Sequence, residues 1–295
     1  MKVARFEFPG GGGLGVVLGE EIADVRKAAP ELATDPAGLF AGGPAALERV
    51  RAAAERAPRL PLSEVRLRAP IARPGKILGI GLNYSDHARE TGRDAPKIQT
   101  WFNKQSTSVN DPFAPILLPA VSQALDYEVE LVVVIGRSGR HVPRSRAMEI
   151  VAGYACGCDY SVRDWQRATP TMIMGKGFDT HAPVGPWITT PDEIDDLSDL
   201  RLRCLVNGEV RQNGRAGDMI HDIPAQIEHL TQAFTLEPGD LIFTGTPAGV
   251  GAAFSPPRFL SAGDRVRVEI DRLGAIEAEI VAEVAQTRIG AASVG

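Results

Sequence analysis

The chain has 295 residues, of which 44% are hydrophobic and 23% are charged, and its formal net charge is −5. This composition excludes a chain that is disordered throughout, and mild acidity without basic runs argues against nucleic acid as the main partner. No apolar run approaches 18 residues, so we expect no transmembrane helix. The N-terminus lacks the apolar core of a secretion signal, and three cysteines cannot all pair, which favours a reduced cytoplasmic setting.

Residues 1–68 are predicted to form a small N-terminal α/β domain. Residues 1–8 alternate like a strand, a glycine-rich turn follows at residues 10–13, and residues 14–18 read as a second strand. An alanine-rich helix is expected at residues 44–57. Four prolines then punctuate residues 58–74, so we place the domain boundary near residues 66–72.

Residues 69–295 are predicted to form one larger unit that is rich in strands, which makes the expected class α+β. The strands expected from apolar or alternating runs are residues 76–81, 127–135, 264–270 and 275–281. The pair Asn207-Gly208 between two such runs predicts a β-hairpin. A short helical segment is expected at residues 85–90, and an amphipathic helix from Asp222 to Phe234 with Asp222 as its cap.

Carboxylates alternate with apolar residues just before the strand that ends at residue 135. Alternate residues of a strand face the same side, so Glu128 and Glu130 project together, with Asp126 in line behind them. Neighbouring carboxylates near a core repel each other and lose hydration. A divalent cation or a proton relieves this cost, and oxygen ligands favour Mg²⁺, Mn²⁺ or Ca²⁺ over zinc. The same pattern also fits a half-exposed strand whose polar face meets water.

Asp159, Arg163 and Gln166 are spaced by four and then three residues, which on a helix puts them on one face. Asp159 would then complete a metal site of three carboxylates. Arg163 and Gln166 would point at whatever the metal holds, and a guanidinium group suits a substrate carboxylate. The alternative is a surface helix with an ordinary Asp–Arg pair.

His87 and Glu90 are three residues apart, so on a helix they are neighbours. A carboxylate beside an imidazole fixes its tautomer and raises its basicity, which suits a general base near neutral pH. An exposed helix with incidental polar neighbours would show the same spacing.

Six sequence blocks, spread in order over residues 79–251, together resemble the fumarylacetoacetate hydrolase superfamily, especially its acylpyruvase-like and 2-hydroxyhepta-2,4-diene-1,7-dioate isomerase-like members. Any one block is weak evidence, whereas six in series are specific. The resemblance implies a β-rich roll with a mixed sheet behind the small N-terminal domain, often as a homodimer. The blocks are Gly79–Glu90, Tyr127–Leu131, Asp159–Gln166, Gly175–Thr180, Pro183–Trp187 and Gly245–Gly251.

The resemblance also implies a role for each matching site residue. Glu128, Glu130 and Asp159 match the carboxylates that hold Mg²⁺, with Mn²⁺ or Ca²⁺ as alternatives. The residues that match the substrate pocket of the family are Arg163, Gln166, Gly245 and Thr246.

The implied reaction is hydrolysis of a carbon–carbon bond in a small 2,4-dioxo acid, of the acylpyruvate or fumarylpyruvate type, through a metal-stabilised enolate. His87, oriented by Glu90, would take a proton from water, and Lys176 would stabilise the developing oxyanion. The same site would also serve as an oxaloacetate decarboxylase or a 2-hydroxymuconate-type isomerase. A protein that only binds small 2-oxo acids is the non-enzymatic alternative.

One stretch departs from the family pattern. Residues 101–106 read W-F-N-K-Q-S where many relatives carry an F-F-K-P-like sequence. We expect the polar Asn103 and Gln105, on either side of Lys104, to reshape the pocket, so the substrate is less well specified than the metal. The partner expected is a small 2-oxo acid, with neither nucleic acid nor membrane involved.

Overall fold

The computed structural model describes residues 1–32, 35–287 and 289–290. Strands predominate over helices, and the sheets contain both parallel and antiparallel pairs, so the predicted β-rich α+β class is confirmed. None of the helices in these residues is long and apolar enough to cross a membrane. The helices are α1 (Val25–Ala28), α2 (Pro36–Ala41), α3 (Gly43–Arg56), α4 (Ser85–Glu90), α5 (Arg163–Ala168), α6 (Ile173–Lys176) and α7 (Ile223–Ala233).

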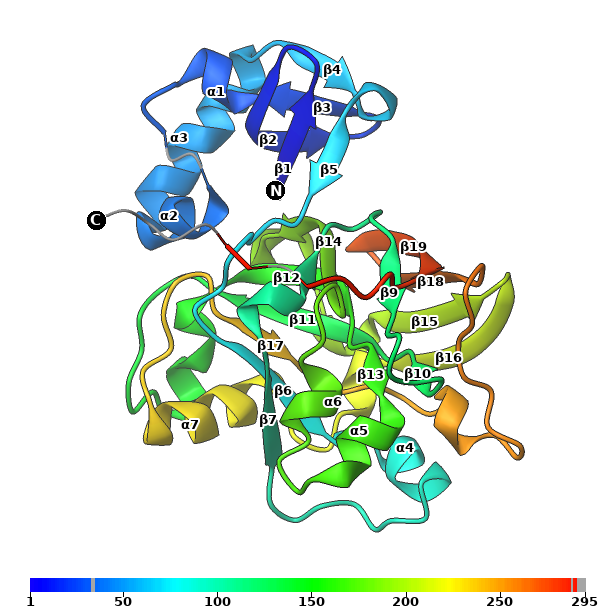
Figure 1. Ribbon diagram of the computed structural model, residues 1–295. Coiled ribbons are helices and arrows are strands. Elements are labelled where there is room, and N and C mark those ends of the chain that lie inside the picture. Colours follow the sequence, from blue (N-terminus) through cyan, green and yellow to red (C-terminus); the bar gives the residue numbers. More distant parts are fainter. Residues whose placement is uncertain (33–34, 288, 291–295) are drawn as a thin grey trace.

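One large sheet runs through the molecule, and a smaller sheet lies beside it (Figure 1). The large sheet has the order β4 (Arg59–Pro61), β3 (Glu21–Asp24), β2 (Gly11–Leu18), β1 (Lys2–Phe8), β14 (Ala182–Thr189), β12 (Val151–Cys158), β11 (Val129–Ile135), β17 (Leu241–Phe243), β6 (Ile77–Gly81) and β7 (Thr100–Lys104), with β5 (Arg66–Arg68) on β1 and β8 (Val109–Asn110) on β14. The smaller sheet has the order β16 (Glu209–Arg215), β15 (Arg201–Val206), β18 (Arg265–Ile270), β19 (Gly274–Ala282) and β9 (Ile116–Leu118), and β10 (Leu125–Asp126) pairs with β13 (Ser161–Val162).

The N-terminal segment forms the upper, blue lobe in Figure 1. Strand β1 pairs with β14, so the large sheet passes from this lobe into the rest of the chain. The division into residues 1–68 and 69–295 stays a prediction. The glycine-rich turn is shorter than predicted, because Gly11 to Gly13 already pair with β1 as part of β2. Gly11 and Gly13 have φ of +144° and +146°, a conformation open almost only to glycine.

Several local predictions for the larger unit are confirmed. Helix α4 has the predicted bounds, and α7 begins after Asp222, whose side chain accepts a hydrogen bond from the N–H of Ala225 at 2.9 Å. Strands β15 and β16 form the predicted hairpin, in which Asn207 and Gly208 both have positive φ, as a type I′ turn requires. Helix α4 directly follows strand β6, which places His87 at one end of the sheet.

Strand β11 lies in the middle of the large sheet, between β12 and β17, and all of its residues are buried. Its apolar side chains belong to two buried clusters on opposite faces of the sheet, because successive residues alternate in direction. The acidic segment therefore enters the most enclosed part of the fold, where a charge without a partner is costly.

Candidate metal centre

Three buried carboxylates from two segments meet at the N-terminal end of β11. Glu128 and Glu130 stand on either side of Val129, and Asp159 directly follows β12, whose last residue Cys158 lies opposite Val129. Each of the three carboxylates offers an oxygen within 4.8 Å of the others. The structure thus brings together the three side chains that the sequence predicted to share one cation.

Asp159 reaches this cluster by a route that differs from the prediction. The expected helix over residues 159–166 is wrong at its start, because Asp159 lies between β12 and β13 and helix α5 begins only at Arg163. The N–H of Asp159 donates to the carbonyl oxygen of Glu128 at 2.8 Å, which continues the pairing of β11 with β12. Strand pairing, not a shared helix face, therefore places Asp159 beside Glu128.

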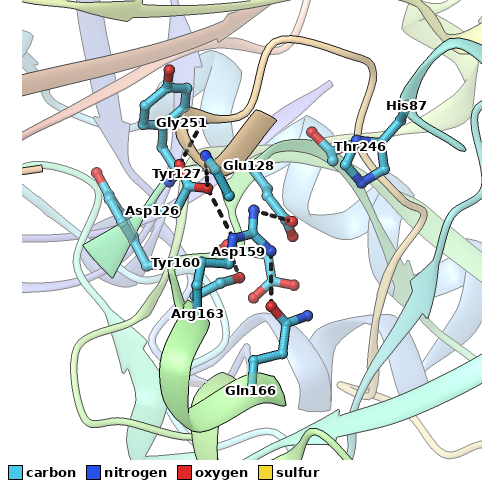
Figure 2. A network of polar contacts seen from close by, with 12 residues as sticks. His87, Asp126, Tyr127, Glu128, Asp159, Tyr160, Arg163, Gln166, Thr246 and Gly251 are labelled. Carbon is cyan, nitrogen blue, oxygen red and sulfur yellow. Dashed lines mark hydrogen bonds and ion pairs between the residues drawn. The ribbon is translucent and has the colours of Figure 1, made fainter. Parts of the chain in front are cut away.

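Lys176 and Arg163, which were expected to face the substrate, pair with the carboxylates of the cluster, and their contact with a substrate stays a prediction. The Nζ of Lys176 lies 2.6 Å from Glu128 Oε2 and 2.5 Å from Asp159 Oδ2. Arg163 pairs with Glu128 Oε1 at 2.7 Å and donates to Gln166 at 2.9 Å, and Figure 2 shows it between these two side chains. Burial raises the pKa of Glu128, but Arg163 and Lys176 outweigh burial and hold that pKa far below its usual range.

A third cation, Lys104, was not assigned to the site from the sequence. Its Nζ donates to Asp159 Oδ1 at 2.6 Å and to the carbonyl oxygen of Tyr160 at 3.1 Å, and its side chain is fully buried. The neighbours Asn103 and Gln105 are exposed, so Lys104 is the member of this stretch that faces the carboxylates. The alternation in β7, where Phe102 and Lys104 share the buried face, is the signal that would have identified it.

Glu130 has no comparable cationic partner. One of its carboxylate oxygens accepts a hydrogen bond from the N–H of Gly245 at 2.7 Å, and within the described residues no lysine, arginine or histidine nitrogen lies within 4.0 Å of it. Burial and then the negative charges of Asp159 and Glu128 raise the pKa of Glu130 well above its ordinary value. The cluster therefore contains one buried carboxylate that is not compensated.

A divalent cation fits this donor set. Glu128, Glu130 and Asp159 would hold it, since hard oxygen ligands in a buried cluster suit Mg²⁺ or Mn²⁺. Counting Asp126, which pairs with Arg163, and with Glu130 ionised, four buried carboxylates stand against three buried cations, so the protein contributes one net negative charge. A bound dication would change this to one net positive charge, which favours an anionic substrate.

The predicted general base, His87, and its partner Glu90 lie at the same end of the large sheet as the carboxylates. His87 Nδ1 lies 2.7 Å from Glu90 Oε1, and the other oxygen of Glu90 accepts a hydrogen bond from the N–H of Gly249 at 2.8 Å. A carboxylate on Nδ1 leaves Nε2 as the basic nitrogen of a neutral imidazole. His87 is buried, and when protonated its ring lies near enough to Glu128 to lower the pKa of that carboxyl.

Residues 76–281, which contain all of these side chains, match the family described as "Fumarylacetoacetate (FAA) hydrolase C-terminal". The chain belongs to the fumarylacetoacetate hydrolase family. The curated relative named oxaloacetate tautomerase FAHD2A, mitochondrial, of Bos taurus is 40% identical over 288 residues, which cover 95% of this chain and 92% of the relative.

Solved structures of other members of the fumarylacetoacetate hydrolase family agree with the fold. Maleylpyruvate hydrolase from Sphingobium sp. SYK-6, in complex with manganese(II) and pyruvate, is 34% identical with a TM-score of 0.81, over 96% of this chain and 99% of that chain. A 5-carboxymethyl-2-hydroxymuconate delta-isomerase from Mycobacterium smegmatis is 34% identical with a TM-score of 0.78, over 97% and 100%. Family membership and fold are thus confirmed, and the relatives include hydrolases, isomerases and tautomerases.

Gly245 and Thr246, which match the family's substrate pocket, form hydrogen bonds with other residues of the site. Gly245 binds Glu130 through its N–H, and the hydroxyl of Thr246 donates to the carbonyl oxygen of Val129 at 2.9 Å. Gln212, which the sequence did not suggest, donates to Thr246 Oγ1 at 2.7 Å and accepts from the N–H of Val129 at 2.9 Å. These bonds fix the backbone around Glu130, and substrate binding by Gly245 and Thr246 stays a prediction.

Asp126 binds Arg163, the cation that pairs with Glu128. Its carboxylate accepts hydrogen bonds from the N–H groups of Gly251 at 2.7 Å and Ala252 at 2.9 Å, and from Arg163 Nε at 2.8 Å (Figure 2). These bonds hold Asp126 away from the three oxygens that face one another. Its role is therefore to position the guanidinium group that pairs with Glu128.

Replacing Lys104 with methionine is expected to tighten Mn²⁺ binding and to raise KM for an anionic substrate, each by about tenfold, because a buried positive charge is lost. Calorimetric titration with Mn²⁺ and steady-state kinetics would measure the two effects, with the exposed Lys97→Met as the matched control. Weaker Mn²⁺ binding in Lys104→Met would contradict the expectation and show that orientation of Asp159 outweighs charge.

Proposed function

We propose that this protein is a divalent-metal-dependent tautomerase that interconverts the keto and enol forms of a small 2-oxo diacid such as oxaloacetate. The observation that carries the proposal is the pair of buried His87 and half-buried Glu90 beside a carboxylate cluster that lacks one positive charge. Identity of 40% with oxaloacetate tautomerase FAHD2A over nearly the whole chain supports this choice among the activities of the family.

Each of the side chains has a distinct part in the proposed reaction. His87 removes a proton from carbon 3 of the substrate, and the electron pair of that C–H bond forms the C2–C3 double bond of the enol. The 2-oxo oxygen takes up a proton from water, and His87 releases to water the proton that it removed from carbon 3, so the numbers of atoms and electrons stay the same. Glu90 holds the imidazole in the tautomer that accepts a proton on Nε2.

The cations and the bound metal would stabilise the oxygen that gains charge. Lys176 uses two of its three N–H donors on Glu128 and Asp159, which leaves one for the 2-oxo oxygen. Bound Mg²⁺ or Mn²⁺ would act as a Lewis acid on the 2-oxo group. The positive charge that results at the site attracts the substrate carboxylates.

Hydrolysis of an acylpyruvate is the second candidate, and it uses the same residues. His87 would then take a proton from water, and the resulting hydroxide would attack the distal carbonyl. The carbon–carbon bond breaks, and its electron pair leaves with the enolate of pyruvate, which takes up the proton from His87, while the other fragment becomes a carboxylic acid. The likeness to maleylpyruvate hydrolase, which was solved with manganese(II) and pyruvate, favours this candidate over a binding protein without activity.

A panel of three substrates with Mg²⁺, with Mn²⁺ or with EDTA separates these functions. Oxaloacetate, an acylpyruvate and a 2-hydroxymuconate-type diacid would be followed by ultraviolet absorbance of the enol and by mass spectrometry of products. We expect metal-dependent conversion of enol to keto oxaloacetate without release of pyruvate. Faster cleavage of the acylpyruvate would make the protein a hydrolase, and release of pyruvate from oxaloacetate would make it a decarboxylase. No metal-dependent turnover of any of the three would refute the proposal.

A further inference from the structure

A chain of hydrogen bonds links Tyr127, in the acidic segment, to the His87–Glu90 pair. The hydroxyl of Tyr127 donates to the carbonyl oxygen of Gly249 at 3.1 Å. The N–H of Gly249 donates to Glu90 Oε2 at 2.8 Å, and Glu90 Oε1 lies 2.7 Å from His87 Nδ1. The order of contacts is therefore Tyr127, Gly249, Glu90 and His87.

The direction of the Tyr127 hydroxyl is set by Arg211. The Nη1 of Arg211 lies 3.4 Å from the Tyr127 oxygen, and a guanidinium group donates hydrogen bonds but accepts none. Tyr127 therefore accepts from Arg211 and directs its own proton toward Gly249. Arg211 is held in turn over the ring of Phe254, 5.4 Å from its centre.

The backbone of Gly249 has little freedom to move when its bond to Tyr127 changes. Its φ is +111°, and a Cβ at this position would lie 1.9 Å from the carbonyl oxygen of Arg211 on β16. The glycine is thus pressed against β16 on one side and bonded to Tyr127 and Glu90 on the other. A displacement at the Tyr127 hydroxyl would be passed to the N–H that Glu90 accepts.

We propose that Tyr127 is a positioning residue for the His87–Glu90 pair and acts through Gly249. The inference rests on the proposed function in that His87 is taken as the base. Tyr127 stands between Asp126 and Glu128, so one short segment sets both the carboxylate cluster and, through the hydroxyl of Tyr127, the orientation of the base. Metal binding and proton transfer would then be aligned by the same piece of backbone.

Tyr127→Phe tests the proposal because it removes one hydroxyl and keeps the ring. We expect kcat to fall by about 3- to 10-fold, the usual effect of one hydrogen bond, with KM and Mn²⁺ affinity unchanged. Tyr154→Phe is the matched control, since it removes the hydroxyl of another buried tyrosine in the same core. In a Glu90→Ala background, Tyr127→Phe should not lower kcat further, because the side chain through which Tyr127 acts is absent. An unchanged kcat, or the same loss in both backgrounds, would overturn the proposal.

A second readout needs no substrate. The proton on Nδ1 of His87, bonded to a carboxylate, gives a downfield proton NMR signal that His87→Ala identifies by its loss. We expect Tyr127→Phe to weaken this signal and Tyr154→Phe to preserve it, and an undisturbed signal in Tyr127→Phe would contradict the positioning role. Because this measurement is independent of turnover, it separates failure of the positioning role from failure of the proposed function. Should Tyr127→Phe not fold, Arg211→Met is expected to weaken the same signal, and an unchanged signal there would count equally against the proposal.

Discussion

Replacing Glu130 with glutamine is expected to abolish divalent-cation binding and turnover together while the fold is preserved. Glutamine keeps the size of the side chain and still accepts the hydrogen bond from Gly245, but it removes the carboxylate that lacks a cationic partner. We expect the Kd for Mn²⁺ to rise by more than about 100-fold, beyond the 10- to 100-fold that loss of an outer-shell partner costs. Calorimetric titration and the oxaloacetate assay measure the two losses.

The same substitution should stabilise the metal-free protein. The pKa of Glu130 is raised by burial and by its carboxylate neighbours, so the folded state binds a proton more tightly than the unfolded state. The charged carboxylate therefore costs stability above its folded pKa, and this cost disappears as the pH falls toward 4.5, the ordinary value of the group. In EDTA at pH 7, Glu130→Gln should melt at a higher temperature than the wild type, and the difference should vanish in acid.

Added Mn²⁺ should stabilise the wild type but not Glu130→Gln. At 100 times its Kd, a ligand that binds only the folded state adds about 2.7 kcal/mol of stability. The wild type should gain this increment with Mn²⁺, Glu130→Gln should not, and the exposed Glu55→Gln should behave as the wild type does. Tight Mn²⁺ binding by Glu130→Gln would remove this residue from the metal site.

His87→Ala is expected to lower turnover by about 10²- to 10⁴-fold, the usual contribution of a general base. Metal binding should persist, because His87 is not among the three carboxylates that face one another. Glu90→Ala should show a smaller loss, since the imidazole remains but its orienting partner is gone. Kinetics at saturating Mn²⁺ and calorimetry on the same samples separate the two properties.

The control for this experiment is His229→Ala, on the exposed side of α7. It should leave turnover at the wild-type level. Wild-type turnover in His87→Ala would show that another group or the solvent takes the proton, and the assignment of the base would then be wrong.

The features of the site that could be predicted from the sequence are those set by local periodicity. Glu128 and Glu130 share a side because a strand alternates, and His87 meets Glu90 because residues three apart on a helix are neighbours. The same reasoning failed for Asp159, because its backbone pairs with Glu128, 31 positions earlier. That pairing is not visible in the local spacing.

Lys104 shows a second limit of the same kind. A lysine at the end of a strand usually reaches solvent, and only the meeting of β7 with the segment after β12 makes it a buried partner of Asp159. Gln212 was missed because it comes from the smaller sheet and satisfies the N–H of Val129 across the sheet boundary. Contacts between distant segments decide these roles, whereas the family resemblance supplied Lys176, which periodicity alone would not have placed.

Glu128, Glu130 and Asp159 are proposed to hold one hard divalent cation. Anomalous diffraction from crystals soaked in Mn²⁺ would locate that cation. We predict a single manganese peak with one oxygen from each of the three carboxylates at about 2.0–2.2 Å, and with Lys176 and Lys104 still beside the cluster. Manganese bound elsewhere, or carboxylates still bridged by the two lysines with no peak between them at saturating Mn²⁺, would show that these three residues do not form the metal site.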